Sequence, residues 1–363
     1  MLVTTKQVGL KQLPVAGGSN IGLVDKGRGV GLLKLWQQVN ILDGPLQDSV
    51  GWLHSIDIAA QQETPVFGIY TINTAAGSWR EDWASGQLKA IEVPSGIIGR
   101  FQPWTGAAWS NWDTPWANDA LKTGTLPLIS WEARNFTIAS AAQPTYSNSA
   151  VCKGVWDDTL ITWLKAAGAW GKPFLLRFFW EGNGLWYPWA AGANGNTPGS
   201  YIDAFRHVAR LVRQYAPNAR ILWNVGTSGS GWLPLEDCYP GDAYCDYTSL
   251  DFYNTGTQPG GWSKSWQPFV AVKPWYDRII ALAPSKSIVV AETGCVPQGG
   301  DKAGWYAAIP SALALMPAIR AVVAFDNKDP SGMDFRVTAD PTVYAVWKSL
   351  IKQYAGEKLA GSS

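Results

Sequence analysis

From about residue 64 onward, short apolar runs rich in β-branched residues alternate with longer segments of helical period. Their near-continuous apolar character predicts strands that are buried on both faces, as in a parallel sheet. Eight such runs occur, at residues 65–71, 96–104, 126–133, 174–181, 220–226, 247–254, 287–294 and 321–327. Apolar residues at helical spacing predict helices before the fourth, fifth, seventh and eighth runs, and a last helix near the end of the chain.

Eight strands that alternate with helices predict a (β/α)8 barrel. A doubly wound open sheet is the alternative, but it would carry a glycine-rich phosphate turn after its first strand, and "TINTAAGSW" is not such a turn. We therefore assign residues 61–356 to the barrel. Residues 1–60 form an N-terminal extension that could be a small accessory unit, a packing extension or an attachment segment, and residues 357–363 form a tail.

Composition narrows the possible functions. The chain has 363 residues, of which 47% are hydrophobic, and a net charge of +1 with its Lys and Arg residues scattered. That charge gives no electrostatic footprint for nucleic acid. No run of about 18 apolar residues predicts a membrane-spanning helix, and the first residues lack the apolar centre of a signal peptide.

Tryptophan is unusually frequent, with 22 residues against 3 methionines. Its flat apolar ring suits the C–H faces of sugars, so we expect some of these residues to line a carbohydrate cleft; cores and protein interfaces are the other uses. Histidine is rare: His54 and His207 are the only two in the chain. We therefore expect no metal, no cofactor and no histidine-based nucleophile, and His207 should pack beside the apolar face of its helix.

The four cysteines form an even set in a chain of low charge. Cys238 and Cys245 bracket the short segment "CYPGDAYC", which favours a local disulfide and leaves Cys152 and Cys295 as a second pair. Disulfides would indicate an extracellular setting. Four reduced, buried thiols are the alternative.

The predicted strand ends carry the candidate chemistry, because barrel enzymes place their functional residues at the C-terminal ends of the strands. Carboxylates and aromatic rings prevail there, which suits glycoside hydrolysis by two carboxyl groups without a metal. Glu181 and Glu292 are the best pair. Each ends a strongly apolar run, and the fourth and seventh strands should face each other across the barrel opening.

Two further residues could support this pair. An apolar wall would raise the pKa of the carboxyl group that acts as the acid. Arg177 lies four residues before Glu181, so we expect it on the same strand face, where it could orient the other carboxylate. Tyr253 could donate a hydrogen bond to that carboxylate. The alternative for all four residues is a structural set of ion pairs and hydrogen bonds at the barrel mouth.

The stretch "LLRFFWEGNGLWYPW" resembles the acid/base segment of family 26 glycoside hydrolases, whose pattern is roughly R-x-x-H-E-x-N-G followed by aromatic residues. The segments "LPLISWEA", "CYPGDAYCDYTSLDFYN" and "IVVAETG" resemble later parts of the same family, and the likeness runs from about residue 64 to 350. The resemblance implies a retaining (β/α)8 enzyme. The common activity of the family is endo-hydrolysis of β-1,4-mannan, with β-1,3-xylan and mixed-linkage β-glucan as variants.

The resemblance also implies a role for each matching residue. Glu181 would be the general acid/base and Glu292 the nucleophile, with carboxyl groups about 5–5.5 Å apart, and Arg177 and Tyr253 would support the nucleophile. Residues expected to contact or position the sugar are Trp104, Trp131, Trp180, Asn183, Trp186 and Trp189.

Trp180 departs from the pattern, since the family has a histidine there that typically contacts the sugar near the scissile bond. A tryptophan has one N–H donor and no acceptor. This departure weakens the transfer of any one of the family's substrates to this chain. Mannan stays the leading specific expectation, and other polysaccharides, including bacterial-envelope glycans, stay open.

Two other readings compete with a free polysaccharide hydrolase. A non-catalytic carbohydrate-binding protein could use the same barrel, although both glutamates and Arg177 argue against it. A virion- or cell-surface depolymerase would use residues 1–60 for attachment. The expected partner is a polysaccharide or oligosaccharide, and the protein is expected to be a monomer in an extracellular, surface or virion-associated location.

Overall fold

The computed structural model divides the chain into two compact units, residues 1–63 and 64–363. It describes the second unit over residues 65–70, 96–122, 124–138, 141–227, 232–329 and 331–354. In the first unit it describes the backbone of six strands, which are Leu2–Val3 (β1), Val8–Lys11 (β2), Asn20–Val24 (β3), Gly29–Leu32 (β4), Gln38–Ile41 (β5) and Val50–Trp52 (β6). His54 and the tail at residues 357–363 lie outside the described residues.

The six N-terminal strands form an antiparallel sheet in the order β1-β4-β5-β6-β2-β3. Whether this unit is an accessory unit, a packing extension or an attachment segment is not decided by its strand order. An attachment role for it stays a prediction.

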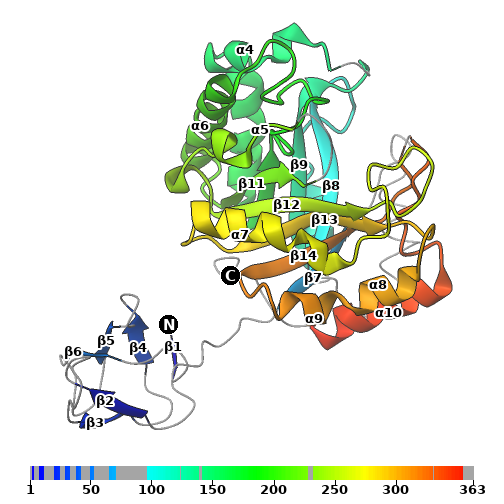
Figure 1. Ribbon diagram of the computed structural model, residues 1–363. Helices are drawn as coiled ribbons and strands as arrows, with labels where there is room; N and C mark the ends of the chain where they lie inside the picture. The colour runs from blue at the N-terminus through cyan, green and yellow to red at the C-terminus, as the bar shows by residue number, and fades with distance from the viewer. Residues whose placement is uncertain are drawn as a thin grey trace. The chain divides into compact units, whose positions relative to one another are not determined.

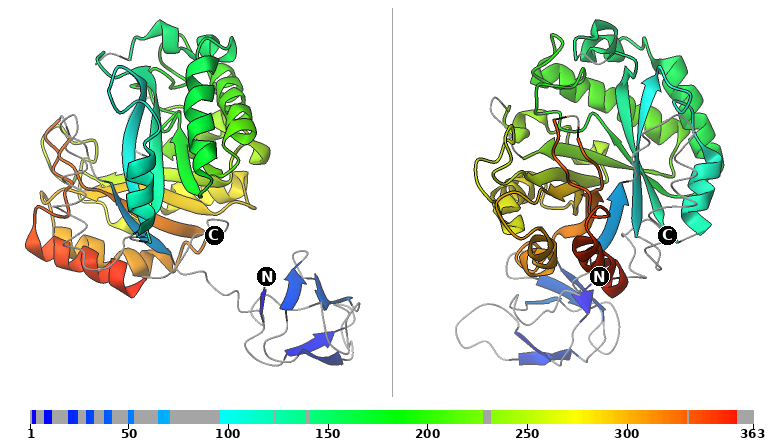
Figure 2. Two further views of the ribbon diagram at one scale, coloured as in Figure 1. Left: turned by 180° about the vertical axis from the view of Figure 1, so that it is seen from behind. Right: turned by 90° about the vertical axis from the view of Figure 1, so that its right-hand side faces the viewer.

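The second unit is a closed parallel barrel, as the alternation of strands and helices predicted (Figures 1 and 2). Its strands are Val66–Tyr70 (β7), Ile97–Thr105 (β8), Leu126–Asn135 (β9), Phe174–Phe178 (β10), Ala219–Gly226 (β11), Tyr247–Asn254 (β12), Ile288–Cys295 (β13) and Ile319–Phe325 (β14). Each pairs with its neighbour in sequence, and β14 closes the ring on β7. All eight predicted runs form strands, so the (β/α)8 fold is confirmed.

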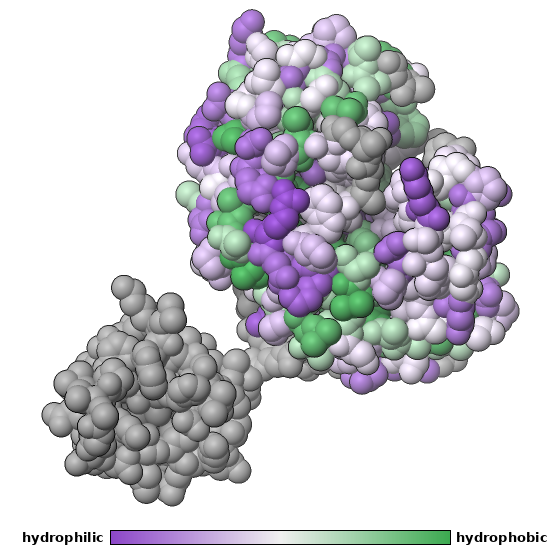
Figure 3. Space-filling view, viewed as in Figure 1, coloured by the Kyte–Doolittle hydropathy of each residue, from purple (hydrophilic) through white to green (hydrophobic). Residues whose placement is uncertain are grey.

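Helices surround the barrel (Figures 1 and 2). They are Thr114–Lys122 (α3), Asn148–Cys152 (α4), Asp157–Trp170 (α5), Pro198–Tyr215 (α6), Lys273–Leu282 (α7), Lys302–Ala307 (α8), Ile309–Leu313 (α9) and Pro341–Gln353 (α10). Pro310 separates two short helices, because it lies in the first turn of α9 just after α8 ends. Hydrophilic side chains gather over α6 and α7 (Figure 3), where Arg278 pairs with Glu236.

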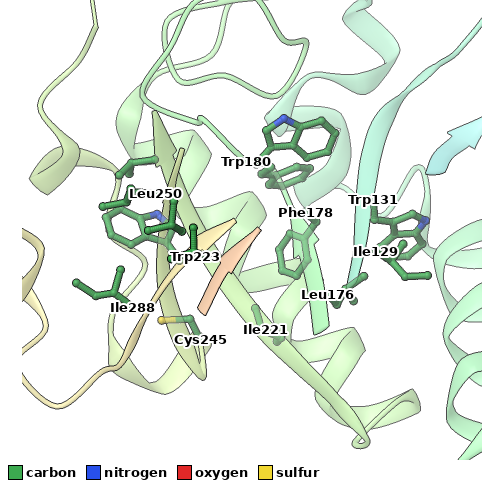
Figure 4. Close-up of a cluster of buried hydrophobic side chains, with 14 of the residues drawn as sticks. Ile129, Trp131, Leu176, Phe178, Trp180, Ile221, Trp223, Cys245, Leu250 and Ile288 are labelled. Atoms are coloured by element: carbon green, nitrogen blue, oxygen red, sulfur yellow. The ribbon is translucent and has the colours of Figure 1, made fainter. Parts of the chain in front are cut away.

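Strict alternation along the strands separates two cores. Leu128, Leu175 and Leu222 point into the barrel, whereas their neighbours Ile129 and Leu176 belong to the larger core between barrel and helices (Figure 4). A strand position therefore decides whether a side chain reaches the barrel interior or the helical layer.

The fourth strand is shorter than predicted. It ends at Phe178, and Glu181 lies in the turn that follows. The expectation that Arg177 and Glu181 share one strand face is therefore wrong, and Glu181 must enter the site by another route.

The expected disulfides are absent, because all four cysteines are free. Cys238 ends one 3-10 segment and Cys245 follows another. Both are buried, which raises the pKa of their thiols to about 12 and about 11. With these raised pKa values, only a small fraction of the two thiols is ionised to the thiolate that disulfide formation needs. Cys152 lies exposed at the end of α4, whereas Cys295 is buried at the end of β13, where its sulfur accepts a hydrogen bond from Asn254.

None of the described helices combines the length and the apolar character that a membrane crossing requires. His207 lies on α6 and contacts Asp157 of α5 through Nε2, at 2.7 Å from Oδ1.

Candidate active site

One charged side chain lies at the centre of the upper barrel. Arg177 points inward from β10 and is fully buried. Its Nη1 donates to both carboxylate oxygens of Asp251, at 3.0 and 2.8 Å, and its Nη2 donates to Glu292. Its Nε donates to the Ser130 hydroxyl at 3.0 Å. All three nitrogens of the guanidinium group therefore donate hydrogen bonds, which fixes the orientation of the side chain.

Glu292 reaches the interior through an irregularity in its strand. Val289 and Ala291 point inward, so plain alternation would direct Glu292 toward the helices. The register of β13 against β14 shifts between Val290 and Thr293, and this shift brings the carboxylate inward. Irregularities of this kind commonly re-aim side chains beside active sites.

Both oxygens of the Glu292 carboxylate have a donor. Oε1 accepts from Arg177, and Oε2 accepts from the hydroxyl of Tyr253, which lies on the neighbouring strand β12. Glu292 is 7% exposed, so this carboxylate is nearly removed from water. It is thus held in one orientation by two donors, as a nucleophile requires.

Glu181 lies in a strained turn after β10. Phe179 has φ 52° and Glu181 has φ 48°, values that residues with side chains rarely adopt. Such conformations persist only where the surroundings enforce them. The Glu181 N–H donates to Asn224 Oδ1 at 2.9 Å, and the Tyr201 hydroxyl donates to the Phe179 carbonyl at 2.8 Å.

Further hydrogen bonds hold the rest of this turn. Asn183 exchanges two with the backbone of Gly226 on β11, at 3.1 and 3.0 Å. The Trp189 indole donates to the Trp180 carbonyl at 2.8 Å. The glycine at position 226 lets the Trp232 ring pack closely on β11, because a Cβ there would lie 1.9 Å from that ring. The turn therefore depends on β11 and α6 as much as on its own residues.

The surroundings of Glu181 favour its neutral form. Burial raises the pKa of its carboxyl group well above the usual value, and the negative charges of Asp251 and Glu292 raise it further. Arg177 and a hydrogen bond from the Trp186 indole, 3.1 Å from Oε2, act in the opposite direction. Trp186 is itself 41% exposed and packs at 4.6 Å against the Trp232 ring, edge to face.

Trp180 is buried beside the charged centre. It is 1% exposed, and the Arg177 guanidinium lies 5.2 Å from its ring centroid. Phe101 and Trp189 pack against it at 5.7 and 4.6 Å. Figure 4 shows it at the upper end of β10, beyond Phe178. Here it covers the arginine and presents no open surface.

The structure places three of the other predicted sugar contacts in the core. Trp131 points outward from β9 and stacks on Trp163 of α5 at 4.4 Å, and Trp104 packs at 5.6 Å against Trp131. Trp189 stacks on Tyr187 at 4.4 Å. All three predicted residues are 2% exposed or less, so of the predicted tryptophans Trp186 alone offers an exposed ring.

Three residues of the site were given no role from the sequence: Asp251 and Asn224, which lie at predicted strand ends, and Ser130. Asp251 and Asn224 point inward, and Asn224 Nδ2 donates to Asp251 Oδ1 at 2.9 Å. Ser130 links Arg177 to the hydroxyl of Tyr70, 2.8 Å away. Strand parity relative to Arg177 would have found Ser130, because the two residues are register partners.

Glu132 is a further buried carboxyl group near the same interior. Glu132 is 3% exposed and pairs with Arg134 through two hydrogen bonds, at 3.2 and 2.8 Å. Burial raises the pKa of its carboxyl group, and Arg134 opposes that shift. Within the described residues, no cluster of three His, Cys, Asp or Glu side chains has the arrangement of a metal site. The site therefore offers two carboxyl groups in different settings: the surroundings of Glu181 favour its neutral form, and two donors hold the carboxylate group of Glu292 in place.

The chain is similar in sequence to known glycoside hydrolases. The model of glycosyl hydrolase family 26 matches residues 111–301. Endoglucanase H of Acetivibrio thermocellus is 31% identical over 298 residues, which are 78% of this chain and 31% of that protein, so the chain spans about a third of this relative. A beta-1,3-xylanase, TXYA of a Vibrio species, is 26% identical over 113 residues, which are 28% of this chain and 22% of that protein.

Solved structures share the fold. An endo-beta-1,4-mannanase double mutant of Cellulomonas fimi aligns with a TM-score of 0.61 at 18% identity, over 83% of this chain and 74% of that one. The catalytic domain of a Bacillus sp. JAMB-750 endo-beta-1,4-mannanase aligns with the same score and identity, over 83% and 89%. These structures share the fold, and the family model matches more than half of the sequence, so the chain belongs to glycosyl hydrolase family 26.

Proposed function

We propose that this protein is a retaining, endo-acting hydrolase of a β-linked polysaccharide, with Glu181 as general acid/base and Glu292 as nucleophile. One observation supports the proposal most strongly. Two carboxyl groups occupy opposite electrostatic settings in one water-poor site, with Glu292 held by Arg177 and Tyr253 and Glu181 favoured in its neutral form. Double displacement requires this division of roles.

In the first step, a Glu292 oxygen would attack the anomeric carbon while Glu181 gives its proton to the glycosidic oxygen. The leaving sugar departs and a glycosyl ester forms on Glu292. That ester is uncharged, so one of the charges that raises the pKa of Glu181 disappears. Glu181 therefore stays ionised after giving up its proton and can act as the general base. It takes a proton from water while the water oxygen attacks the anomeric carbon, which releases the sugar and regenerates the Glu292 carboxylate.

For the substrate, we propose a β-glucan. Endoglucanase H, whose name denotes a glucanase, is 31% identical over most of this chain, whereas the two mannanase structures are 18% identical. β-1,4-Mannan is the second candidate, as the common activity of the family. Because polysaccharides are too large to cross a cell membrane, we propose an extracellular or surface location for the protein.

A panel of polysaccharides tests this proposal. The full chain is incubated with mixed-linkage β-glucan, carboxymethyl cellulose, galactomannan, β-1,3-xylan and a bacterial-envelope glycan. We expect hydrolysis of a glucan, with viscosity falling ahead of the release of reducing ends, and proton NMR should show the β-anomer as the first product. Cleavage of galactomannan alone would establish the second candidate. An α-anomer as first product, or no hydrolysis of any polymer, would refute the proposal.

A Trp186→Phe variant should shift the pH dependence of activity. The change removes the N–H that bonds to Glu181 Oε2 but keeps an aromatic ring. This hydrogen bond lowers the pKa of Glu181, so its loss should raise that pKa further. A general acid works only while protonated, so the alkaline limb of the kcat/KM profile should move to higher pH. A Trp275→Phe variant, which changes a ring beside Arg278 on α7, serves as the control, and a limb that moves to lower pH would contradict the assignment.

A further inference from the structure

Exposed aromatic rings gather at one end of the barrel. In the part of the chain that the structure describes, three aromatic side chains are exposed: Phe136, Trp186 and Trp262, at 44, 41 and 39%. Each lies in the segment that follows a barrel strand, namely β9, β10 and β12. This is the end that carries Glu181 and Glu292. Large exposed apolar groups at a functional face commonly mark a binding surface.

Trp262 lies next to the partner of the nucleophile. Its ring centroid is 5.9 Å from that of Tyr253, with the ring planes at 88°, and 6.0 Å from that of Phe335. The Tyr253 hydroxyl donates to Glu292. One aromatic residue therefore separates an exposed indole from the carboxylate that attacks the sugar.

The segment that carries Trp262 is fixed by buried polar groups. The Ser263 N–H donates to Thr255 Oγ1 at 2.7 Å, and the Thr255 N–H donates to Ser263 Oγ at 3.3 Å. Asn254 Oδ1 accepts from the N–H groups of Gly256 and Gln267, each at 3.0 Å. Asn254 and Thr255 are fully buried, so the backbone on both sides of the ring is anchored in the core.

A glycine permits the close approach on which this anchoring depends. A Cβ at Gly261 would lie 2.7 Å from Thr255 Oγ1 and 2.9 Å from the Gln258 carbonyl oxygen. The ring of Trp262 is thus presented to solvent by a rigid backbone, so little ordering would be lost when a ligand stacks on it.

We propose that Trp262 is a sugar-stacking subsite on the nucleophile's side of the scissile bond. The proposal rests on the proposed function, since it takes Glu292 to hold the sugar that is being transferred. Trp186 bonds to the acid and so flanks the leaving sugar, whereas Trp262 flanks the sugars that stay on the enzyme in the first step. The ligand is a neutral sugar unit of a β-linked chain, bound through its apolar C–H face.

Binding is measured apart from hydrolysis. The full chain with Glu181→Gln is compared with Glu181→Gln/Trp262→Ala by electrophoresis in gels that contain either mixed-linkage β-glucan or galactomannan. We expect the second substitution to weaken retardation by one of these polymers about tenfold in apparent Kd. Glu181→Gln/Trp262→Phe, which keeps a ring, should recover most of the affinity. Trp275→Ala on α7, which removes a half-buried ring beside Arg278 on the outer surface, should leave the affinity unchanged.

Kinetics separate binding from mere support of Tyr253. In an otherwise wild-type chain, Trp262→Ala should raise KM about tenfold for long oligosaccharides of the cleaved polymer, and much less for a disaccharide aryl glycoside, with kcat nearly kept. A fall in kcat that is equal for both substrates would mean that Trp262 only props Tyr253, and would overturn the proposal.

The two proposals fail differently. If the wild-type chain hydrolyses a polymer and its gel retardation does not depend on Trp262, the subsite proposal is refuted and the proposed catalysis is kept. If retardation depends on Trp262 but the wild-type chain hydrolyses no polymer, the proposed catalysis is refuted and Trp262 is kept as a sugar-binding residue. A chain that is neither retarded nor active on these polymers would refute both.

Discussion

A Glu292→Ala variant should lose at least about 10⁴-fold in kcat/KM on the cleaved polysaccharide, because no covalent intermediate can form without the carboxylate. The cavity left beside Arg177 and Tyr253 would admit a small anion. Added azide should therefore restore turnover of an activated aryl glycoside, and should attack the anomeric carbon from the side of the missing carboxylate. The product is expected to be a glycosyl azide of inverted configuration.

Thermal unfolding of Glu292→Ala provides the control for its fold, and Glu292→Gln keeps the shape of the side chain without the charge. Near-normal turnover of either variant would rule out Glu292 as the nucleophile. Azide rescue that gives only the retained product would point to Glu292 as the acid/base instead, and would reverse the two roles.

A Glu181→Ala variant should fall by about 10²–10⁴-fold on polysaccharide, which is the usual contribution of a general acid. Formation of the glycosyl ester from a dinitrophenyl glycoside should stay fast, because that leaving group needs no proton. Hydrolysis of the ester should then become slow, so stopped-flow measurements should show a burst followed by a low steady state. Azide should accelerate that steady state and yield a glycosyl azide of retained configuration.

Equal losses on the polysaccharide and on the dinitrophenyl glycoside, without a burst, would show that Glu181 is not the proton donor. A folding control is essential here, because Glu181 has a positive φ, and a change at this position could alter the turn. Glu181→Gln keeps the backbone N–H that bonds to Asn224 and most of the side-chain volume. It should therefore match Glu181→Ala in chemistry and the wild type in melting temperature.

The hydrophobic pattern was sufficient to predict the barrel. Parallel strands buried on both faces are apolar along their whole length, and the runs therefore stood out one by one. The two glutamates could be chosen because each interrupts an apolar context at a strand end. The short helices α3 and α4 were not predicted, since α4 has only five residues and offers too little of the helical period to detect.

Most of the tryptophans predicted to contact sugar are buried instead, because the type of a residue does not show which face of its strand it occupies. Trp131 and Arg177 lie on adjacent strands one register step apart, yet one faces the helices and the other faces the interior. Counting strand parity from Arg177 would have placed Trp131 outside the cleft. Parity alone would also have misplaced Glu292, because no feature of the sequence reveals the register shift in β13.

The disulfide prediction failed for a different reason. Spacing and an even count carry no information on burial, and the structure buries three of the four thiols individually. Trp262, in contrast, could not be predicted as a binding residue from the sequence. The observations that suggest this role are its exposure and its position beside Tyr253, and both are set by the fold.

The turn that carries Glu181 has a consequence for protein engineering. Its left-handed residues, Phe179 and Glu181, are kept in place by side chains from Tyr201 and Asn224, which belong to a later helix and the next strand. A loop transplanted into another barrel with the motif alone would relax to ordinary dihedral angles and turn its carboxyl group away. The transferable module is therefore the turn together with Tyr201, Asn224 and Gly226, and a chimera should be designed around that set.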